Sequence, residues 1–285
     1  MSAPAGRAAL ITGCSTGIGR ATALRLDGSG WRVYAAVRRQ VDADGLAAAG
    51  SDRLQPIILD VTEPDSIAAA VARIDAECPA GLDALVNNAG LAYTGPLELL
   101  PLDELRSQLE VNVVGQVAVT QAAIPALRRA SGRIVNITSI GGIVATPFYG
   151  PYVASKFALE AISDCLRGEL RPWGIETIAI EPGSIATEIW STGLERFDRT
   201  EERLPAAAQS LYGKAIKSLR RTSRETGDRG LPADVAAAVI ERALNARRPR
   251  ARYRVGRDAH AMALLSRALP DRTWDRLLAR IMRLP

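Results

Sequence analysis

Two residues near the middle of the chain, Tyr152 and Lys156, lie four positions apart in the stretch YVASK. On a helix this spacing puts both side chains on one face. A free tyrosine has a pKa of about 10, too high for easy proton exchange near neutral pH, and a fixed ammonium beside it favours the phenolate. The pair therefore predicts that Tyr152 acts as a general acid–base. Tyr149 has Val153 four residues further on and predicts no such chemistry.

A serine hydroxyl lies 13 positions before this tyrosine. Ser139 ends the apolar run GRIVNITS at 132–139, which predicts a strand. Ligands of open α/β sheets bind at the carboxyl ends of the strands. Ser139 is therefore expected to hold a carbonyl or alcohol oxygen of the substrate. The alternative to this catalytic interpretation is that Tyr152 and Lys156 are a pair of solvent-exposed side chains on a helix, which their spacing alone also fits.

The stretch LITGCSTGIGR at 10–20 fits two patterns. Residues 13–17 match the G-x-S-x-G elbow of a hydrolase, in which Ser15 would be the nucleophile. The glycines also match a turn that opens a helix, where backbone N–H groups bind phosphate. The hydrolase hypothesis is weak because the only histidine is His260, in a basic tail, and because Ser15 follows the first strand and not an interior one. The phosphate interpretation is favoured, although G-x-x-x-G-x-G differs from the usual dinucleotide spacing.

The elements that position these residues alternate between short apolar runs and helical patterns, which predicts a doubly wound α/β fold with helices on both faces of the sheet. Strands are expected at 8–12, 32–37, 54–61, 82–90, 132–139, 175–183 and 252–256. Helices are expected near 17–28, 64–77, 101–130, 152–172 and 233–246. Residues 190–232 form the least regular region. This region is expected to be either a substrate loop or a mobile surface excursion.

The composition limits the class of protein. A chain of 285 residues with 47% hydrophobic residues suits one large α/β domain. It has no apolar run long enough for a membrane span, and its three cysteines have neither disulfide-framework nor zinc spacing, so a cytoplasmic protein without a metal site is expected. The net charge of +5 comes from an arginine-rich tail without interleaved aromatics, which argues against a nucleic-acid partner.

Together these motifs resemble the classical short-chain dehydrogenases/reductases. The matching segments are TGCSTGIG at 12–19, NNAG at 87–90, VNVVG around Asn112, Ser139, Tyr152 with Lys156, and PGSIAT at 182–187, in family order. The resemblance implies a single Rossmann-type domain with a seven-stranded, mostly parallel sheet in the order 3-2-1-4-5-6-7. That domain is expected over 1–256, with 190–232 as the substrate-loop insertion and 257–285 as a C-terminal amphipathic helical extension.

The resemblance also implies roles for the catalytic residues. Tyr152 would transfer the proton, while Ser139 and Tyr152 would bind the substrate oxygen. Lys156 would lower the pKa of the tyrosine and bind the nicotinamide ribose. Asn112 would hold a water that links Lys156 to solvent, and its amide can also stabilise a helix kink.

The remaining implied roles concern the cofactor. Thr12 and Asn88 are expected to tie loops together, and Cys14 to pack in the turn. The residues expected to line the cofactor site, besides Tyr152 and Lys156, are Gly13, Ser15, Thr16, Gly17, Ile18, Gly19, Arg38, Asp60, Val61, Asn87, Ala89, Gly90, Pro182, Gly183, Ile185 and Thr187.

The end of the second strand bears on cofactor choice. Enzymes that use NAD usually place an acidic residue there to bind the ribose 2′-hydroxyl. Here Val37 is followed by Arg38 and Arg39, so no carboxylate repels a 2′-phosphate and Arg38 can pair with it. NADP(H) is therefore favoured, with NAD(H) as the alternative.

The substrate and the partners are less constrained. The chain resembles most closely the hydroxysteroid and retinol dehydrogenase branch, which implies a lipophilic alcohol, ketone or aldehyde and a homodimer or homotetramer. The apolar stripe of the final segment is expected to pack on the body or a twin subunit, with a lid or a peripheral membrane contact as the less favoured alternative. Its residues are Trp274, Leu277, Leu278, Ile281 and Met282. A different class of function is a catalytically silent NADP-binding sensor or scaffold, which would not need the complete catalytic set.

Overall fold

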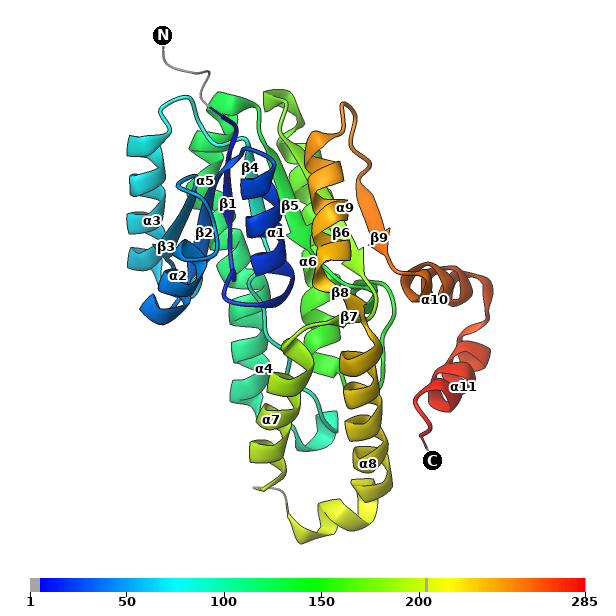
Figure 1. The fold of residues 1–285 in the computed structure, drawn as a ribbon. Coiled ribbons are helices and arrows are strands. Elements are labelled where there is room, and N and C mark those ends of the chain that lie inside the picture. Colours follow the sequence, from blue (N-terminus) through cyan, green and yellow to red (C-terminus); the bar gives the residue numbers. More distant parts are fainter. Residues whose placement is uncertain (1–5, 203–204, 285) are drawn as a thin grey trace.

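A parallel sheet of seven strands forms the centre of the computed structural model, which describes residues 6–202 and 205–284. The expected domain, insertion and extension also include residues 1–5, 203–204 and 285, which lie outside the described residues. The strand order is β3-β2-β1-β4-β5-β6-β9, and every neighbouring pair is parallel (Figure 1). This confirms the predicted order, in which β9 is the seventh strand.

The elements follow the predicted alternation of strand and helix. The strands are β1 (Ala8–Ile11), β2 (Arg32–Val37), β3 (Leu54–Ile58), β4 (Ala84–Asn87), β5 (Arg133–Ile137), β6 (Glu176–Pro182), β7 (Ile185–Ala186), β8 (Leu231–Pro232) and β9 (Arg252–Val255). The helices are α1 (Gly17–Gly28), α2 (Gln40–Ala47), α3 (Pro64–Glu77), α4 (Leu102–Leu109), α5 (Gly115–Ala130), α6 (Gly150–Glu169), α7 (Ile189–Glu201), α8 (Ala206–Arg229), α9 (Ala233–Asn245), α10 (Arg257–Ala268) and α11 (Asp271–Ile281). The short 3₁₀ turns are Leu97–Leu99, Ile140–Gly142 and Arg171–Trp173.

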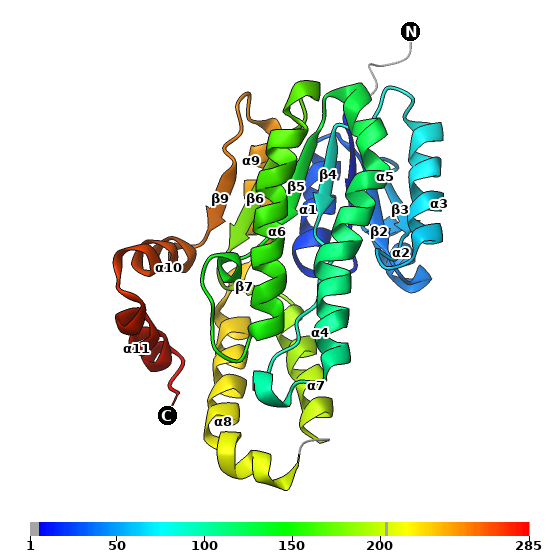
Figure 2. The ribbon, with the colours of Figure 1, turned by 180° about the vertical axis from the view of Figure 1, so that it is seen from behind.

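Helices cover both faces of the sheet, and each face has its own apolar core. On one face α1, α2 and α9 pack on the strands through residues such as Leu26, Leu46 and Ile240. On the other face α3, α5 and α6 lie over the strands (Figure 2), with Ile74 and Leu127 fully buried. Because both faces are covered, the central strands are continuous apolar runs without polar alternation.

Parallel strands bring the motifs of the sequence to one edge of the sheet. The glycine turn follows β1, Arg38 follows β2, Ser139 follows β5 and the PGSIAT segment spans the end of β6. All these strands end at the lower edge in Figure 1. Segments more than 100 residues apart in the chain therefore lie on one side of the molecule, where ligands of open α/β sheets bind.

The prediction of an irregular loop over 190–232 is wrong, because most of this segment forms two helices, α7 and α8. α7 and α8 project beyond the carboxyl edge of the sheet (Figure 1). In α8 the buried residues Ala208, Ala215, Ile216 and Leu219 recur at helical spacing. The pattern was hard to recognise because most of the residues between them are charged or polar. Arg220 of α8 forms ion pairs with Asp198 and Glu201 of α7, which holds the two helices together.

The single helix expected over 101–130 is interrupted. A π-helical turn at Glu110–Val114 separates α4 from α5. Such turns widen the helix by one residue and are frequent at functional sites. Asn112, which the sequence associates with a helix kink, lies inside this turn and is 1% exposed.

The C-terminal segment folds back onto the body of the protein. The apolar stripe of α11 packs through Trp274 and Leu278 against Val144, in the segment that follows Ser139. The hydroxyl of Ser218 in α8 donates to the carbonyl oxygen of Met282 at 2.6 Å. The stripe predicted from the sequence is therefore used mainly within the chain, although Ile281 stays half exposed.

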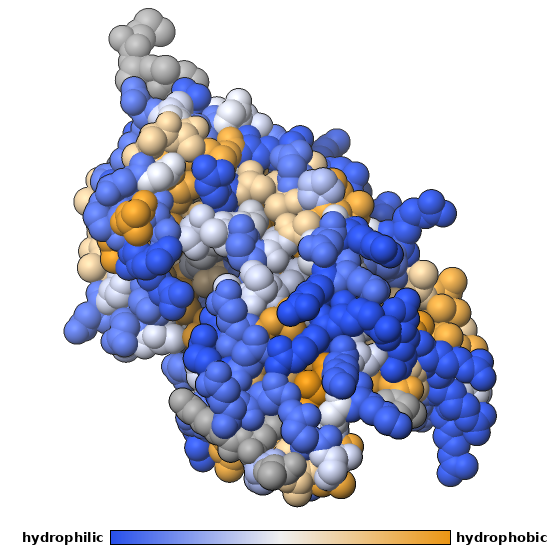
Figure 3. Space-filling model, turned by 60° about the horizontal axis from the view of Figure 1, so that its bottom comes forward, coloured by the Kyte–Doolittle hydropathy of each residue, from blue (hydrophilic) through white to orange (hydrophobic). Residues whose placement is uncertain are grey.

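The surface on the carboxyl side of the sheet is largely hydrophilic. Figure 3 shows hydrophobic areas at its right edge, where α10 and α11 lie, and Leu264 of α10 is 69% exposed. Within residues 6–202 and 205–284, no helix combines the length and the apolar character needed to cross a bilayer. The same residues contain no group of three potential metal ligands.

The packing of α11 predicts a stability effect. Leu278→Ala should lower the free energy of unfolding by about 2–4 kcal/mol, because Leu278 is 3% exposed and its loss leaves a cavity beside Val144. Leu264→Ala, at an exposed position of α10, should change it by less than about 0.5 kcal/mol. Urea unfolding followed by circular dichroism measures both. Equal effects of the two substitutions would show that α11 is not packed as described.

Candidate active site

The turn between β1 and α1 depends on glycine. Gly13 and Gly17 have φ angles of +70° and +57°, in the left-handed region. A Cβ on Gly19 would lie 2.3 Å from the carbonyl oxygen of Gly13. Among the described residues no side chain caps α1, and no acidic residue lies in its first turn. The N–H groups at this helix start, next to Ser15, Thr16 and Ile18, therefore suit the pyrophosphate of a dinucleotide.

The loop after β4 is fixed to this turn by hydrogen bonds. The hydroxyl of Thr12 accepts from the backbone N–H groups of Asn88 and Ala89, both at 2.9 Å. The side chain of Asn88 donates to the carbonyl oxygens of Thr12 and Gly13. Both residues tie the loops together, as the sequence predicts. Ala89 and the neighbouring Gly90 therefore lie beside the phosphate turn.

The segment after β6 approaches the same turn from the other side. A Cβ on Gly17 would lie 3.1 Å from a methyl carbon of Thr187. β7 holds this segment through parallel pairing of Ile185 with Leu231 of β8. The N–H of Gly183 donates to the carbonyl oxygen of Val255 at 2.8 Å, next to Pro182. The structure thus brings the PGSIAT segment and the glycine turn together.

Asp60, Val61 and Asn87, which are predicted to line the adenine side of the cofactor site, have different surroundings. Asp60 uses one carboxylate oxygen to accept from the hydroxyl of Thr62 at 2.8 Å, and Val61 beside it is buried. Asn87 is 1% exposed and donates to Thr120 and Asn136, at 2.8 and 2.9 Å. Its amide therefore belongs to the core, which leaves only its backbone to face a ligand.

The two arginines after β2 differ in their contacts. Arg39 donates two hydrogen bonds of 2.7 Å to Asp42. Arg38 is exposed at the carboxyl edge of the sheet. Arg38 is therefore the member of the pair that stands ready for an external anion.

The catalytic candidates meet at the start of α6. Tyr152 is hydrogen bonded to the side chain of Ser139, and Ser139 also accepts from the N–H of Gly141 at 3.0 Å. The ammonium of Lys156 lies 5.7 Å from the centroid of the Tyr152 ring. It donates to the carbonyl oxygen of Ile137, at the end of β5, at 2.8 Å. The three side chains that the sequence singled out thus share one site.

These features agree with the comparison to known protein families. The family model described as short chain dehydrogenase matches residues 7–196. The chain belongs to the short-chain dehydrogenase family. The family consists of NAD(P)-dependent oxidoreductases that act on CH–OH and C=O groups, and the resemblance predicted from the motifs is confirmed.

Individual relatives place the chain in one branch of the family. Human retinol dehydrogenase 5 is 38% identical, over 100% of this chain and 92% of its own length. Bovine 17-beta-hydroxysteroid dehydrogenase type 6 is 37% identical, over 95% of this chain and 87% of its own length. A solved short-chain dehydrogenase from Burkholderia cenocepacia, in complex with NADP, has a TM-score of 0.73 with 26% identity and covers 98% of each chain. The predicted hydroxysteroid and retinol dehydrogenase branch is thereby confirmed.

Burial dominates the protonation of this dehydrogenase's catalytic pair. It raises the pKa of Tyr152 above its ordinary value, and the hydrogen bond with Ser139 offsets only part of the increase. Burial lowers the pKa of Lys156 to about 8, against an opposing attraction from Glu160. Loss of water penalises the charged forms of both side chains, and the lowering of the Tyr152 pKa expected from Lys156 stays a prediction. Tyr152 is therefore a protonated phenol at neutral pH.

Asn112 connects the π-helical turn to the active site. Its side-chain amide donates to the carbonyl oxygen of Leu91 at 3.0 Å and to the hydroxyl of Ser155 at 3.1 Å. Its Oδ1 accepts from the N–H of Leu91 at 2.9 Å. The kink-stabilising role expected for Asn112 is present. Its amide also fixes α6 between Tyr152 and Lys156.

A small cavity beside Tyr152 includes residues that the sequence did not single out. It has a volume of about 30 Å³ and is lined mostly by apolar groups. Tyr149, which had no predicted role, bonds through its hydroxyl to Ser223 of α8 at 2.7 Å. Its ring also makes an edge contact with Trp190 of α7. These three residues could not be found from sequence spacing, because they come from the start of α6, from α7 and from α8.

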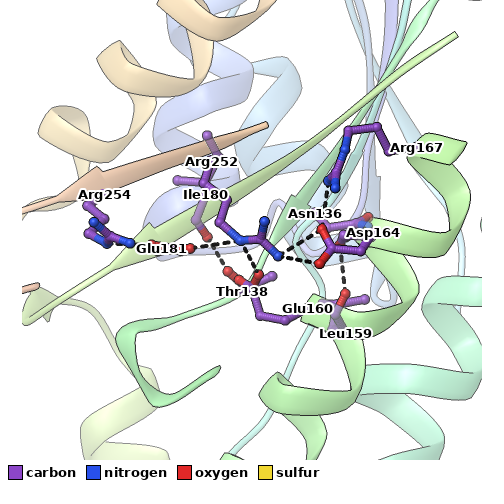
Figure 4. Close-up of polar contacts among 11 residues, drawn as sticks. Asn136, Thr138, Leu159, Glu160, Asp164, Arg167, Ile180, Glu181, Arg252 and Arg254 are labelled. Carbon is purple, nitrogen blue, oxygen red and sulfur yellow. Dashed lines mark hydrogen bonds and ion pairs between the residues drawn. The ribbon is translucent and has the colours of Figure 1, made fainter. Parts of the chain in front are cut away.

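An ionic network joins α6 to β6 and β9 (Figure 4). Glu160, one turn after Lys156, pairs with Arg252 of β9 at 2.9 Å. Arg252 also pairs at 3.3 Å with Glu181 of β6, which is fully buried and pairs with Arg254 at 2.8 Å. Burial raises the pKa of Glu181, as does the nearby Glu160 carboxylate, while the two arginines oppose the increase. The network compensates the buried carboxylates only in part, and it joins α6 to the edge of the sheet.

The hydrolase interpretation of the glycine turn has no geometric support. His260 lies at the start of α10, where its Nδ1 is 2.9 Å from the carbonyl oxygen of Gly256. It lines a cavity of about 730 Å³ together with Asp258, and Ser15 is not among the lining residues. Cys14 is buried with its thiol on the carbonyl oxygen of Ile11, which confirms its packing role.

The buried ammonium of Lys156 predicts a pH effect on stability. Between about pH 8 and 10.5 the unfolded lysine keeps its proton and the folded one loses it, so stability should rise with pH over this range. Relative to Lys156→Met, the wild type should gain up to about 3 kcal/mol in the free energy of unfolding across that window. Urea unfolding of both proteins at several pH values measures the difference. A difference that stays constant with pH would show that Lys156 is not desolvated.

Proposed function

We propose that this dehydrogenase reduces the carbonyl group of an apolar ketone or aldehyde, and oxidises the matching alcohol, with NADP(H). The observation that carries the proposal is the meeting of Ser139, Tyr152 and Lys156 at the sheet edge that also holds the glycine turn. A sensor that only bound the cofactor would need the turn but not this set. The protonated state of Tyr152 is the one that reduction requires.

The chemistry follows from the positions of the side chains. When bound, the cofactor supplies or accepts a hydride at its nicotinamide ring. Ser139 and Tyr152 hold the carbonyl oxygen, and Tyr152 donates its proton to that oxygen as negative charge develops there. The ammonium of Lys156 stabilises the phenolate that remains and binds the nicotinamide ribose. Asn112 keeps α6 in place, and we retain for it the role of holding a water through which Tyr152 regains its proton.

The cavity beside Tyr152 supports an apolar substrate. Its lining includes Ala92, Ile189, Trp190 and Leu194, and most of it comes from the loop after β4 and from α7. The enclosed space beside Tyr152 has room for only a few water molecules. We propose that substrates as large as a steroid or retinoid, which the names of the relatives suggest, bind with α7 and α8 displaced outwards. We propose residues 190–232 as the segment that sets substrate size.

The cofactor proposal rests on the predicted residues of the sheet edge. The helix start at Gly17 would hold the pyrophosphate, and Asp60 the adenine amino group through its carboxylate. Arg38 would bind the 2′-phosphate of NADP(H), while NAD(H) would lack this partner. We propose that the other residues predicted to line the cofactor site also contact the cofactor, as the sequence indicates.

Three further proposals, on domain organisation, oligomeric state and location, follow from the family and the composition. We propose one cofactor-binding domain over 1–256 with 257–285 as its helical extension. We further propose a homodimer or homotetramer, by analogy with the family. A cytoplasmic location is supported by three cysteines that are all free in the structure, as in a reducing compartment.

The proposed acid role of Tyr152 gives the first test. Tyr152→Phe should lower kcat/KM for ketone reduction by about 10³-fold, since it removes the proton donor. Its affinity for NADPH, measured by nucleotide fluorescence, should change by less than about threefold. Tyr149→Phe is the matched control and should retain activity within about tenfold. If the wild type binds NADPH tightly but turns over no member of a ketone panel, the sensor alternative replaces the proposal.

The contrast between the two arginines gives a test of cofactor choice. Arg38→Ala should lower kcat/KM for NADPH about tenfold or more, because it removes a charge-assisted hydrogen bond to the 2′-phosphate. The same variant should leave kcat/KM for NADH unchanged. Arg39→Ala should alter neither, since Arg39 is bound to Asp42. Equal losses with both nucleotides would contradict the assigned role of Arg38.

A further inference from the structure

One residue that lines the cavity beside Tyr152 has a buried hydroxyl without a hydrogen-bond partner. Thr94, in the loop after β4, is 5% exposed and lines the cavity. Its Oγ1 makes no hydrogen bond with any residue in the described part of the chain. A buried hydroxyl without a partner is unfavourable, because it gives up its hydrogen bonds to water. An isosteric valine would fill the same space without this penalty.

The other polar groups of the cavity are already engaged. The hydroxyls of Tyr149 and Ser223 bond to each other at 2.7 Å. The indole N–H of Trp190 donates to the carbonyl oxygen of Ile185 at 2.8 Å. In the proposed function the hydroxyl of Tyr152 binds the carbonyl oxygen that is reduced. Thr94 is therefore the group that is available to recognise a different atom of the substrate.

The backbone on both sides of Thr94 is held in place. The N–H of Tyr93 donates to the side chain of Gln108 in α4 at 2.8 Å. The N–H of Gly95 donates to the carbonyl oxygen of Phe148 at 2.7 Å. Gly95 has a φ of +141°, and a Cβ there would lie 2.9 Å from the Phe197 ring of α7. The two hydrogen bonds anchor the loop to α4 and to the segment before α6, which fixes Thr94 in position, and Gly95 packs against α7.

Building on the proposed function, we propose that Thr94 is a specificity-determining residue that binds a second oxygen function of the substrate. The substrate class is then an apolar ketone or alcohol that carries a further hydroxyl or carbonyl group. Tyr152 and Thr94 line the same small cavity, so the second oxygen of the substrate binds within this enclosed part of the site. The Thr94 hydroxyl can donate to a carbonyl or accept from a hydroxyl, so either group fits.

The test compares substrates that differ only in the second oxygen. Cyclohexanone is compared with the cyclohexanediones, and decalone with the hydroxydecalones, as substrates for reduction by NADPH. The wild type should prefer the best doubly oxygenated member of a set by about tenfold or more in kcat/KM, since a site built to hydrogen-bond an oxygen rejects the analogue that lacks it. Thr94→Val should abolish this preference while keeping kcat/KM for the monoketone. Thr94→Ser should retain the preference.

A matched control is available in β6. Thr177 is fully buried and its Oγ1 likewise has no partner among the described residues, but it does not line the cavity. Thr177→Val makes the same chemical change and should leave the preference intact.

The outcomes separate the two proposals. If Thr94→Val lowers kcat/KM equally for both members of each pair, Thr94 serves the structure or a bound water, and this inference is overturned while the enzyme assignment stands. The inference about Thr94 is likewise overturned if the wild type shows no preference for substrates that carry a second oxygen. If the wild type reduces no compound, both proposals fall.

Discussion

The burial of the Lys156 ammonium is the constraint on which the catalytic arrangement depends. A cation removed from water is unfavourable unless nearby groups compensate it. Here the carbonyl oxygen at Ile137 accepts directly from it, and the Glu160 carboxylate lies one helical turn away. Glu160 in turn needs Arg252, which also meets the buried Glu181. The charge of Lys156 is thus linked through Glu160 and Arg252 to β9, the last strand of the sheet.

Parallel strand order then determines which segments can cooperate. β1, β4, β5 and β6 are neighbours, so the segments that follow them meet without long excursions of the chain. Short polar ties such as Thr12 to Asn88 fix the loops, and glycine at position 19 lets helix and turn approach closely. The π-helical turn places Asn112 where it bonds both Leu91 and α6. The loops at this edge are therefore tied by hydrogen bonds of buried or half-buried polar side chains.

The substrate side is constructed differently. The cavity takes its walls from the loop after β4, the start of α6 and the paired helices α7 and α8. The two helices are joined by arginine ion pairs, and α8 is tied to the C-terminal segment through Ser218. α11 in turn packs against the segment that follows Ser139. The helices that line the cavity thus contact each other and the C-terminal segment, which in turn packs on the segment that follows Ser139.

The sequence by itself predicted the fold class from the alternation of strands and helices, and it singled out Ser139, Tyr152 and Lys156 from local spacing and from the rule that ligands bind where parallel strands end. The strand order followed from the resemblance to the family. The sequence did not reveal α7 and α8, whose buried positions are scattered among charged residues. Nor did it reveal that the amide of Asn87 faces the core. Only the tertiary structure decided the protonation of the catalytic pair and the lining of the cavity by Tyr149, Trp190 and Thr94. Desolvation and enclosure arise from residues far apart in the chain, and no local pattern records which of them will meet.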